Sequence, residues 1–449
     1  MADLPHFIDH DTTLDSPPRP IRPTPRATPR VTPVENTEPR RRFFATLDTP
    51  VMVVTGLLLA IGLMMVYSTT FDWSYQVYGD PSTIFIRHLR NVGVALVIFV
   101  LLALIDYRVW RRVAVLLLLL TIGALVAVLL FGDDTLLDAR RALVNGSLQP
   151  GELAELTIVV YLAAWLGSRR TQVRSVAYGL IPFAVLVGIM AGLVLLQPDI
   201  STAATIVAVA GIMFFLAGGD LVQLGAAAVI VGVVGVLYIT QSGPDYAQGR
   251  LDSYLSGAAD LTQADDHIQQ AIKAFTNGGW TGVGLGQGRQ KFERLPAPHT
   301  DSIFAVIGEE LGILGASLVV LLYIVLVVRG LQIARRAPDS FGSLLAAGVT
   351  IWIAVKALLN IAVMTAIVPP TGASLPFISF GGSSLVVVMA GVGLMLSVSR
   401  VRLLQNAPRR PVTERSQTVA NSDLGGRDRR SRVSGAGRRR SVDSAGSGR

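Results

Sequence analysis

Ten long apolar runs limit what this 449-residue chain can fold into. A helix needs roughly 20 apolar residues to cross a bilayer. Charged residues make up only 16% of the chain, against about 25% in a soluble domain. A backbone in lipid must satisfy its own hydrogen bonds, so the sequence predicts an all-α polytopic membrane protein with about ten transmembrane helices. We place them at 50–68, 88–105, 113–132, 153–167, 176–196, 201–217, 221–240, 303–328, 343–366 and 382–399.

Arginines in the short connections predict which side of the membrane the termini occupy. After runs two, four and eight stand Arg108, Arg111, Arg112, Arg169, Arg170, Arg174, Arg329, Arg335 and Arg336. In a ten-helix arrangement these connections share one side with the Arg-rich C-terminal tail, and the positive-inside rule makes that side cytoplasmic. Both termini are therefore predicted to be cytoplasmic. One large extracytoplasmic loop, 241–301, is expected between helices 7 and 8.

Two polar tails flank a membrane domain that we place at 46–400. Residues 1–45 are rich in Pro and Arg, and residues 401–449 contain twelve arginines and four acidic residues. Neither stretch can bury an apolar core, so both are predicted to be disordered cytoplasmic tails. A basic tail next to a membrane helix favours contact with anionic lipid over nucleic-acid binding. The chain has no cysteine, which excludes disulfides and thiolate metal sites.

Polar residues collect at the extracytoplasmic ends of the predicted helices. They belong to four separate connections and include Arg140, Arg141, Gln149, Glu152, Gln197, Asp199 and Asp301, together with the stretch "VPPTGASLPFISFGGSS". Each residue alone could be a helix cap or a headgroup contact. An unpaired charge in the bilayer costs on the order of 3 kcal/mol or more, so their gathering at one interface favours a site for a charged, polar lipid headgroup.

The large loop adds further candidates near this interface. "HIQQAIKAFTNGG" predicts an amphipathic helix that ends at glycines, and "GVGLGQGRQ" is either a tight turn or a backbone nest that binds phosphate. Asp301 precedes run eight, in which Glu309 falls on a similar helix face and Glu310 on the opposite one. Gly308 and Gly312 are spaced to let another helix approach closely. The loop also carries Lys273, Arg289, Lys291 and Arg294, whose cations suit a pyrophosphate.

Five motifs resemble those of the SEDS family (shape, elongation, division and sporulation). They are "LALIDYR", "LVNGSLQPGELAEL", "LLQPDISTA", "QKFERLPAPHTDSIFAVIGEELGILGA" and "VPPTGASLPFISFGGSSL". The resemblance covers about residues 45–400, and the large loop is more similar to the division branch, FtsW, than to the elongation branch, RodA. It implies a ten-helix peptidoglycan glycosyltransferase that polymerises lipid II, the undecaprenyl-pyrophosphate disaccharide pentapeptide, at the outer face of the bacterial cytoplasmic membrane.

The resemblance also implies residue roles and partners. The essential aspartate of the family's His-Thr-Asp motif falls on Asp301, which we expect to act as the general base. Expected partners are a class B penicillin-binding protein transpeptidase and other division or elongation proteins, with localisation at the division septum. The expected substrate-binding residues are Arg141, Gln149, Glu152, Gln197, Asp199, Gln270, Arg289, Lys291, His299, Thr300, Glu309, Ser379, Gly381, Gly382, Ser383 and Ser384.

Cations should stabilise the leaving pyrophosphate. Arg141, Arg289 and Lys291 are candidates, and a divalent cation such as Mg²⁺ or Mn²⁺ is a further option. No ligand spacing in the sequence defines a metal site, so the metal ligands are unknown at this stage.

Several residues depart from the family pattern. The usual Gly, Trp, Ser, Lys, Phe, Gln and Tyr are replaced by Asp138, Ala142, Gly151, Glu155, Ser302, Lys356 and Phe380. Glu155 exchanges a cation for an anion near the expected site, and Lys356 is a candidate to replace that cation. Two alternatives therefore stay open beside the polymerase: a lipid-linked precursor flippase, and a catalytically degenerate SEDS scaffold for a transpeptidase.

Overall fold

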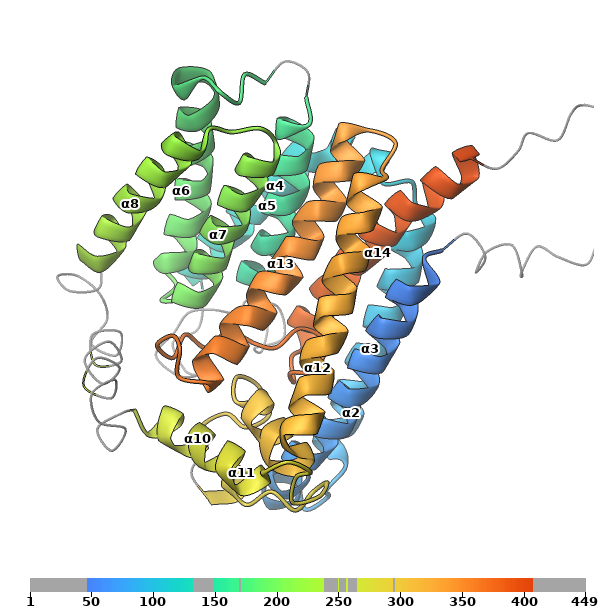
Figure 1. Ribbon diagram of the computed structural model, residues 1–449, viewed down its shortest axis with the longest axis vertical. Helices are drawn as coiled ribbons and strands as arrows, with labels where there is room; N and C mark the ends of the chain where they lie inside the picture. The colour runs from blue at the N-terminus through green and yellow to red at the C-terminus, as the bar shows by residue number, and fades with distance from the viewer. Residues whose placement is uncertain are drawn as a thin grey trace, which may run out of the picture. The chain divides into compact units, whose positions relative to one another are not determined.

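Every regular element in the described part of the chain is a helix (Figure 1). The computed structural model describes residues 47–131, 149–168, 171–237, 249, 256, 265–293 and 295–406. All of them belong to one compact unit, Phe44–Arg449. The predicted tail 1–45 lies outside the described residues, as do Arg140, Arg141 and Arg294. Of the predicted tail 401–449, residues 401–406 are instead the end of the last helix, and 407–449 lie outside the described residues.

Each of the ten apolar runs forms a helix. Seven helical segments are long and apolar enough to cross a membrane, and α7 and α8 are shorter apolar helices. This makes the chain an all-α, multi-pass membrane protein, while the count of ten crossings and the cytoplasmic termini stay predictions. The helices are α2 (Thr49–Tyr78), α3 (Thr83–Leu104), α4 (Arg108–Phe131), α5 (Pro150–Leu166), η1 (Val176–Leu180) continued by α6 (Ile181–Leu195), α7 (Ile200–Leu216), α8 (Leu221–Leu237), α12 (Ile303–Arg335), α13 (Ser340–Met364) and α14 (Gly382–Asn406).

Aspartates fix where several of these helices begin. The Asp48, Asp199 and Asp339 carboxylates each accept a hydrogen bond from a backbone amide in the first turn of α2, α7 and α13. Such caps satisfy amides that have no partner within the helix. Asp48 also pairs with Arg329 of α12 at 3.0 Å, so the start of α2 is tied to the far end of α12.

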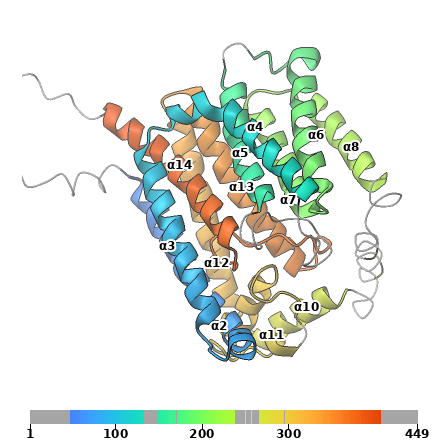
Figure 2. The same ribbon diagram turned by 180° about the vertical axis from the view of Figure 1, so that it is seen from behind.

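Two helices form the centre of the bundle. α13 packs against α12, α5 and α7, and α14 packs along α3, as Figure 2 shows from behind. The apolar stretch of α14 is the most buried of the seven candidate spans, followed by that of α13. Both helices therefore contact protein more than lipid, and polar groups on them can be paired inside the bundle.

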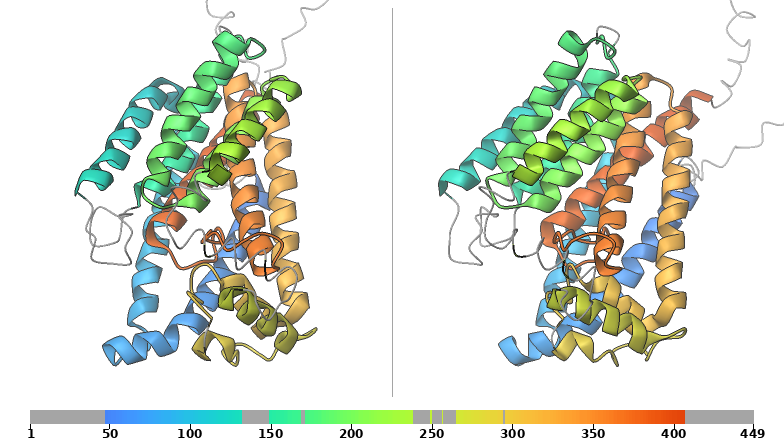
Figure 3. Two further views of the ribbon diagram at one scale, coloured as in Figure 1. Left: turned by 90° about the vertical axis from the view of Figure 1, so that its left-hand side faces the viewer. Right: turned by 60° about the vertical axis from the view of Figure 1, so that its left-hand side comes forward.

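The connection between α13 and α14, residues 365–381, folds back against the bundle. Figure 3 shows this connection in orange, at the same end of the bundle as α10. A Cβ atom on Gly62 of α2 would lie 2.4 Å from the Phe377 carbonyl oxygen, so the two backbones are in direct contact. The Tyr323 hydroxyl of α12 donates a hydrogen bond to the Pro376 carbonyl. Contacts with both helices hold this connection in place at the end of α13.

The large loop contributes the predicted amphipathic helix. α10 (Asp266–Gly278) ends at Gly279, with α11 (Gln290–Glu293) further along the loop. α10 packs on α12, and a Cβ atom on Gly278 would lie 1.9 Å from the Gly308 carbonyl oxygen. The close approach expected at Gly308 is thus confirmed. A Cβ atom on Gly312 would lie 2.4 Å from the Gly282 amide nitrogen, so the large loop approaches closely there too. The φ of 69° at Gly312 also breaks the regular helix inside α12.

Candidate functional site

Hydrogen bonds to backbone carbonyl oxygens hold the segment that contains Asp301. The Asn360 side chain on α13 donates to the Asp301 carbonyl oxygen and to that of Ala373, both at 2.7 Å. The Ser379 hydroxyl donates to the Thr300 carbonyl oxygen at 2.7 Å, and the Phe380 amide donates to that of His299 at 2.8 Å. The His-Thr-Asp segment is therefore held by α13 and by the connection that follows it.

The Asp301 side chain lies beside Gly372 of the same connection. A Cβ atom on Gly372 would be 3.4 Å from Asp301 Oδ2, and the φ of Gly372 is +80°. This conformation and the short approach both favour glycine. Asp301 is half-buried, so its carboxylate lies at the boundary between the bundle and its surroundings.

Aromatic contacts orient His299. Its ring stacks on Trp73 of α2, with centroids 4.7 Å apart, and meets the Phe380 ring edge-on at 5.7 Å. Burial lowers the pKa of the His299 imidazole, so this side chain is neutral near pH 7. A neutral imidazole stacked between two rings can position the segment but adds no positive charge to the site.

A second polar cluster surrounds the start of α5. Ser383 and Ser384, at the start of α14, face the Glu152 carboxyl group, and Lys356 and Asp199 lie within electrostatic range of it. One turn further along α5, Glu155 forms an ion pair of 2.7 Å with Lys356. These contacts bring together the starts of α5, α7 and α14 around one lysine of α13.

The two clusters are continuous. The hydroxyl oxygens of Ser374 and Ser384 are 3.3 Å apart. Ser374 follows Ala373, whose carbonyl oxygen is bound by Asn360, and Asn360 lies one helical turn after Lys356. The contacts therefore run from Glu152 through the connection 365–381 to Asp301. We call these residues the Asp301 site: Glu152, Glu155, Asp199, His299, Thr300, Asp301, Lys356, Asn360, Gly372, Ser374, Ser379, Ser383 and Ser384.

Carboxylates of α12 occupy the amides of the glycine-rich loop. Glu309 accepts hydrogen bonds from the Arg289 and Gln290 amides at 3.1 Å and 3.2 Å, and Glu310 accepts one from the Gly286 amide at 3.0 Å. The loop thus forms an anion-binding turn, but its anions belong to the chain itself. Glu309, expected to share a cavity with Asp301, instead secures this loop.

Lys291 is likewise committed to the fold. Its ammonium group pairs with Glu310 at 2.6 Å, and both side chains are buried. It also donates to the Ser68 hydroxyl of α2 at 2.8 Å. These partners favour a structural role for Lys291 over contact with a leaving group, whereas Arg289 is exposed.

The other expected site residues are spread more widely. Gln149 is exposed just before α5. Gln197 is buried, and its amide donates to the Leu125 carbonyl oxygen at 3.0 Å. Gln270 bonds to Asp266 within α10. Gly381 and Gly382 lie beside the Asp301 site, where a Cβ atom on Gly382 would be 3.0 Å from the Asn91 side chain.

Asn360 and Trp73 contact the His-Thr-Asp segment but were not expected as site residues. An asparagine inside the apolar run "ALLNIAVM" is the signal that could have found Asn360, because an amide in a membrane helix needs a partner. Nothing in the sequence singles out Trp73, since aromatic residues are common at the ends of membrane helices.

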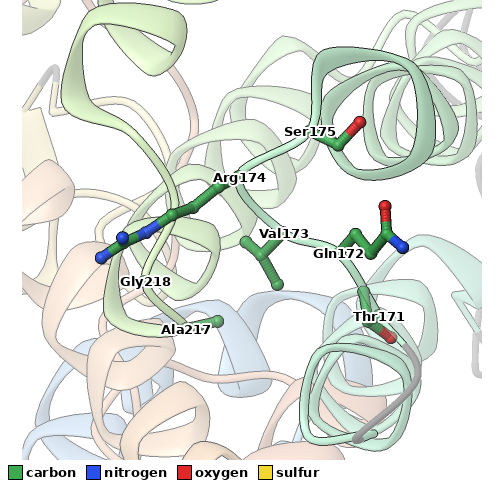
Figure 4. Close-up of a pocket in the computed structure, with 7 residues that line it drawn as sticks. All are labelled: Thr171, Gln172, Val173, Arg174, Ser175, Ala217 and Gly218. Carbon is green, nitrogen blue, oxygen red and sulfur yellow. The ribbon is translucent and has the colours of Figure 1, made fainter.

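A cavity of about 620 Å³ lies away from this site (Figure 4). It is lined by Thr171, Gln172, Val173, Arg174, Ser175, Ala217 and Gly218. These residues precede η1 and follow α7, whereas Asp199 lies at the opposite ends of α6 and α7. The cavity therefore contains no expected substrate-binding residue.

Metal binding gains no support from the side chains that can be placed. Within the described ranges, no group of three His, Asp or Glu residues could hold a metal ion. The divalent cation stays a prediction, and the chemistry below is derived from the side chains of this chain.

Comparisons with known proteins identify the family of this chain. The sequence model of the family described as "Cell cycle protein" (FtsW, RodA, SpoVE) matches residues 49–403. Stage V sporulation protein E of Bacillus subtilis is 36% identical over 79% of this chain and 97% of its own length. The probable peptidoglycan glycosyltransferase FtsW of Trichlorobacter lovleyi is 36% identical over 79% of this chain and 93% of its own.

Two solved structures share the fold. A chain of a peptidoglycan synthase complex, described as coordinating polymerization and crosslinking, aligns with a TM-score of 0.65 and 26% identity over 79% of this chain and 98% of its own. The rod shape determining protein RodA of Thermus thermophilus aligns with a TM-score of 0.58 and 26% identity over 79% of this chain and 97% of its own. The family match over 49–403 and the shared helical fold show that the chain belongs to the FtsW/RodA/SpoVE family of membrane proteins.

Proposed function

We propose that this protein is a peptidoglycan glycosyltransferase that polymerises lipid II at the outer face of the cytoplasmic membrane. The observation that carries the proposal is Asp301, a half-buried carboxylate in a segment whose backbone is held by Asn360 and by the connection 365–381. Relatives that are matched over 93% and 94% of their own length are named probable peptidoglycan glycosyltransferases, and this supports the reaction class.

Asp301 acts as the general base in this proposal. The 4-hydroxyl of the acceptor sugar attacks C1 of the donor's muramyl sugar, and its proton passes to the Asp301 carboxylate. The new bond joins the acceptor oxygen to C1, while the bond between C1 and the phosphate oxygen breaks. Its electron pair leaves with undecaprenyl pyrophosphate, and C1 is inverted. A base held by backbone contacts is already oriented when the hydroxyl arrives.

A transpeptidase of the class B penicillin-binding type is the proposed partner. The similar synthase complex is described as coordinating polymerization with crosslinking, and crosslinking needs a second activity. Names of the FtsW type among the relatives favour a role in division, so we place the proposed activity at the septum.

The direct test is polymerisation of labelled lipid II by the purified protein with its cognate transpeptidase. A gel that resolves glycan length should show a ladder from the wild type and none from Asp301→Ala or Asp301→Asn. Asp72→Ala is the matched control, because Asp72 is a carboxylate on α2 that, within the described part of the chain, accepts a hydrogen bond from its helix neighbour Gln76. A ladder from a folded Asp301→Ala protein would refute the assignment of the base.

A further inference from the structure

A buried ion pair joins α5 to α13 inside the Asp301 site. Lys356 Nζ lies 2.7 Å from Glu155 Oε2, and the two side chains are 6% and 1% exposed. The Trp352 indole donates to the same oxygen at 3.0 Å. Glu155 Oε1 is buried and has no hydrogen-bond partner in the part of the chain that the structure describes. The carboxylate is therefore held from one side only, by two groups of α13.

Lys356 also influences carboxylates other than its direct partner. It lies within electrostatic range of Glu152 and Asp199 as well as Glu155. Charges interact strongly in a low-dielectric interior, so one ammonium group balances part of the charge of three acidic side chains. The charged neighbours of Glu152 are Lys356 and Asp199, and its neutral neighbours are Ser383 and Ser384.

The resemblance noted above implies Lys at the position of Glu155 and Gln at the position of Lys356. In this chain the two side chains meet in an ion pair of 2.7 Å. The cation near Glu152 is therefore supplied by α13.

We propose that Lys356 is a positioning residue for the Asp301 site, which, with Glu155 as its counterion, holds the Glu152 carboxyl group beside Ser383 and Ser384. This inference rests on the proposed glycosyltransferase function. Ser384 contacts Ser374 in the connection that holds Asp301, so the orientation of Glu152 is passed to the loop around the base. Glu152 then offers a fixed hydrogen-bond acceptor to a hydroxyl or amide of the substrate headgroup.

Paired substitutions separate this role from a structural one. Glu155→Gln with Lys356→Gln removes both charges together, whereas removal of one partner alone would leave a destabilising unpaired charge in the interior. Glu155→Lys with Lys356→Gln returns the cation to α5, within one turn of Glu152. Asp48→Asn with Arg329→Gln is the matched control, because it neutralises a pair that joins α2 to α12 away from the Asp301 site.

The readouts are the rate of lipid II polymerisation, its pH profile and the melting temperature of the detergent-purified complex. The neutral pair should melt near the wild-type temperature but polymerise about a hundredfold more slowly. The acidic limb of the pH profile of the neutral pair should move to higher pH, because Glu152 without a neighbouring ammonium group takes up a proton more readily. The relocated cation should restore the rate to within about tenfold of wild type.

The outcomes distinguish the two proposals. If the wild type polymerises and the folded neutral pair does so at the same rate and with the same pH profile, the pair is structural and the positioning role is refuted. The positioning role is also refuted if Glu155→Lys with Lys356→Gln folds but polymerises lipid II no faster than the neutral pair. If the folded wild-type complex forms no glycan, the proposed function fails and this inference fails with it.

Discussion

Lys291 and Glu310 form an ion pair of 2.6 Å between two almost fully buried side chains, 1% and 0% exposed. Lys291 belongs to α11 in the large loop, and Glu310 belongs to α12. The Ser68 hydroxyl of α2 bonds to both groups. The pair therefore joins the loop to two membrane helices close to the start of α12.

Loss of Lys291 should destabilise the protein strongly. Lys291→Met leaves the Glu310 carboxylate buried without its cation, which costs about 3–5 kcal/mol. The unfolding of purified protein, followed by tryptophan fluorescence, measures this loss. Arg289→Met changes an exposed cation two residues away and should leave the unfolding transition in place. Equal transitions for both variants would show that the buried pair contributes little.

Asn360 should matter more for rate than for stability. Asn360→Leu removes both hydrogen bonds to the Asp301 and Ala373 carbonyl oxygens. Misplacement of a base by about 1 Å can cost a hundredfold in rate, whereas lost hydrogen bonds cost about 1–3 kcal/mol of stability. Initial polymerisation rates measure the loss of rate, and melting temperatures measure the loss of stability. Thr365→Ala, at the exposed end of α13, is the control, and a full rate in Asn360→Leu would contradict the clamp.

A side chain at residue 372 should interfere with Asp301. Gly372→Ala forces a Cβ atom to 3.4 Å from the Asp301 carboxylate at a φ of +80°, a conformation that costs about 1–3 kcal/mol for other residues. We expect slower polymerisation with lipid II still bound. Gly56→Ala on α2 meets no atom within 4 Å and should be neutral. A Gly372→Ala protein with wild-type kinetics would place the reacting groups elsewhere.

His299 should make stability depend on pH below neutrality. Burial lowers the pKa of its folded imidazole, so between the folded and unfolded pKa values the unfolded chain binds more protons. Stability is therefore full above the unfolded pKa, about 6.5, and declines as pH falls toward the folded pKa. His299→Phe keeps an aromatic ring against Trp73 and should reduce this decline. Melting temperatures of both proteins from pH 8 to pH 5 test it, and identical pH dependence would refute it.

Much of the fold is predictable because lipid restricts the backbone so strongly. Each apolar run is a helix, since no other lone segment can satisfy its hydrogen bonds in a bilayer. The helix ends are less predictable. α2 was expected over 50–68 but continues to Tyr78, because its polar second half is held by protein contacts such as the stacking of Trp73 on His299.

The site is predictable only in part, for a related reason. The His-Thr-Asp segment and the serines at the start of α14 were expected together, because they share one predicted interface. The partners of the charged groups were not predicted, since Glu155 and Lys356 are 201 residues apart in the sequence. The glycine-rich loop was interpreted as either a tight turn or an anion-binding nest, and only the tertiary structure shows that Glu309 and Glu310 are its anions.

Trp73 stacks on His299, so a fluorophore contacts the residue that lies two positions before Asp301 in the sequence. The chain has only five tryptophans, so subtracting the signal of a Trp73→Phe protein would isolate the emission of this indole. Ring contact makes that emission sensitive to the charge and position of the imidazole. The protein thus carries its own optical sensor of events beside the base, readable in real time without an attached dye.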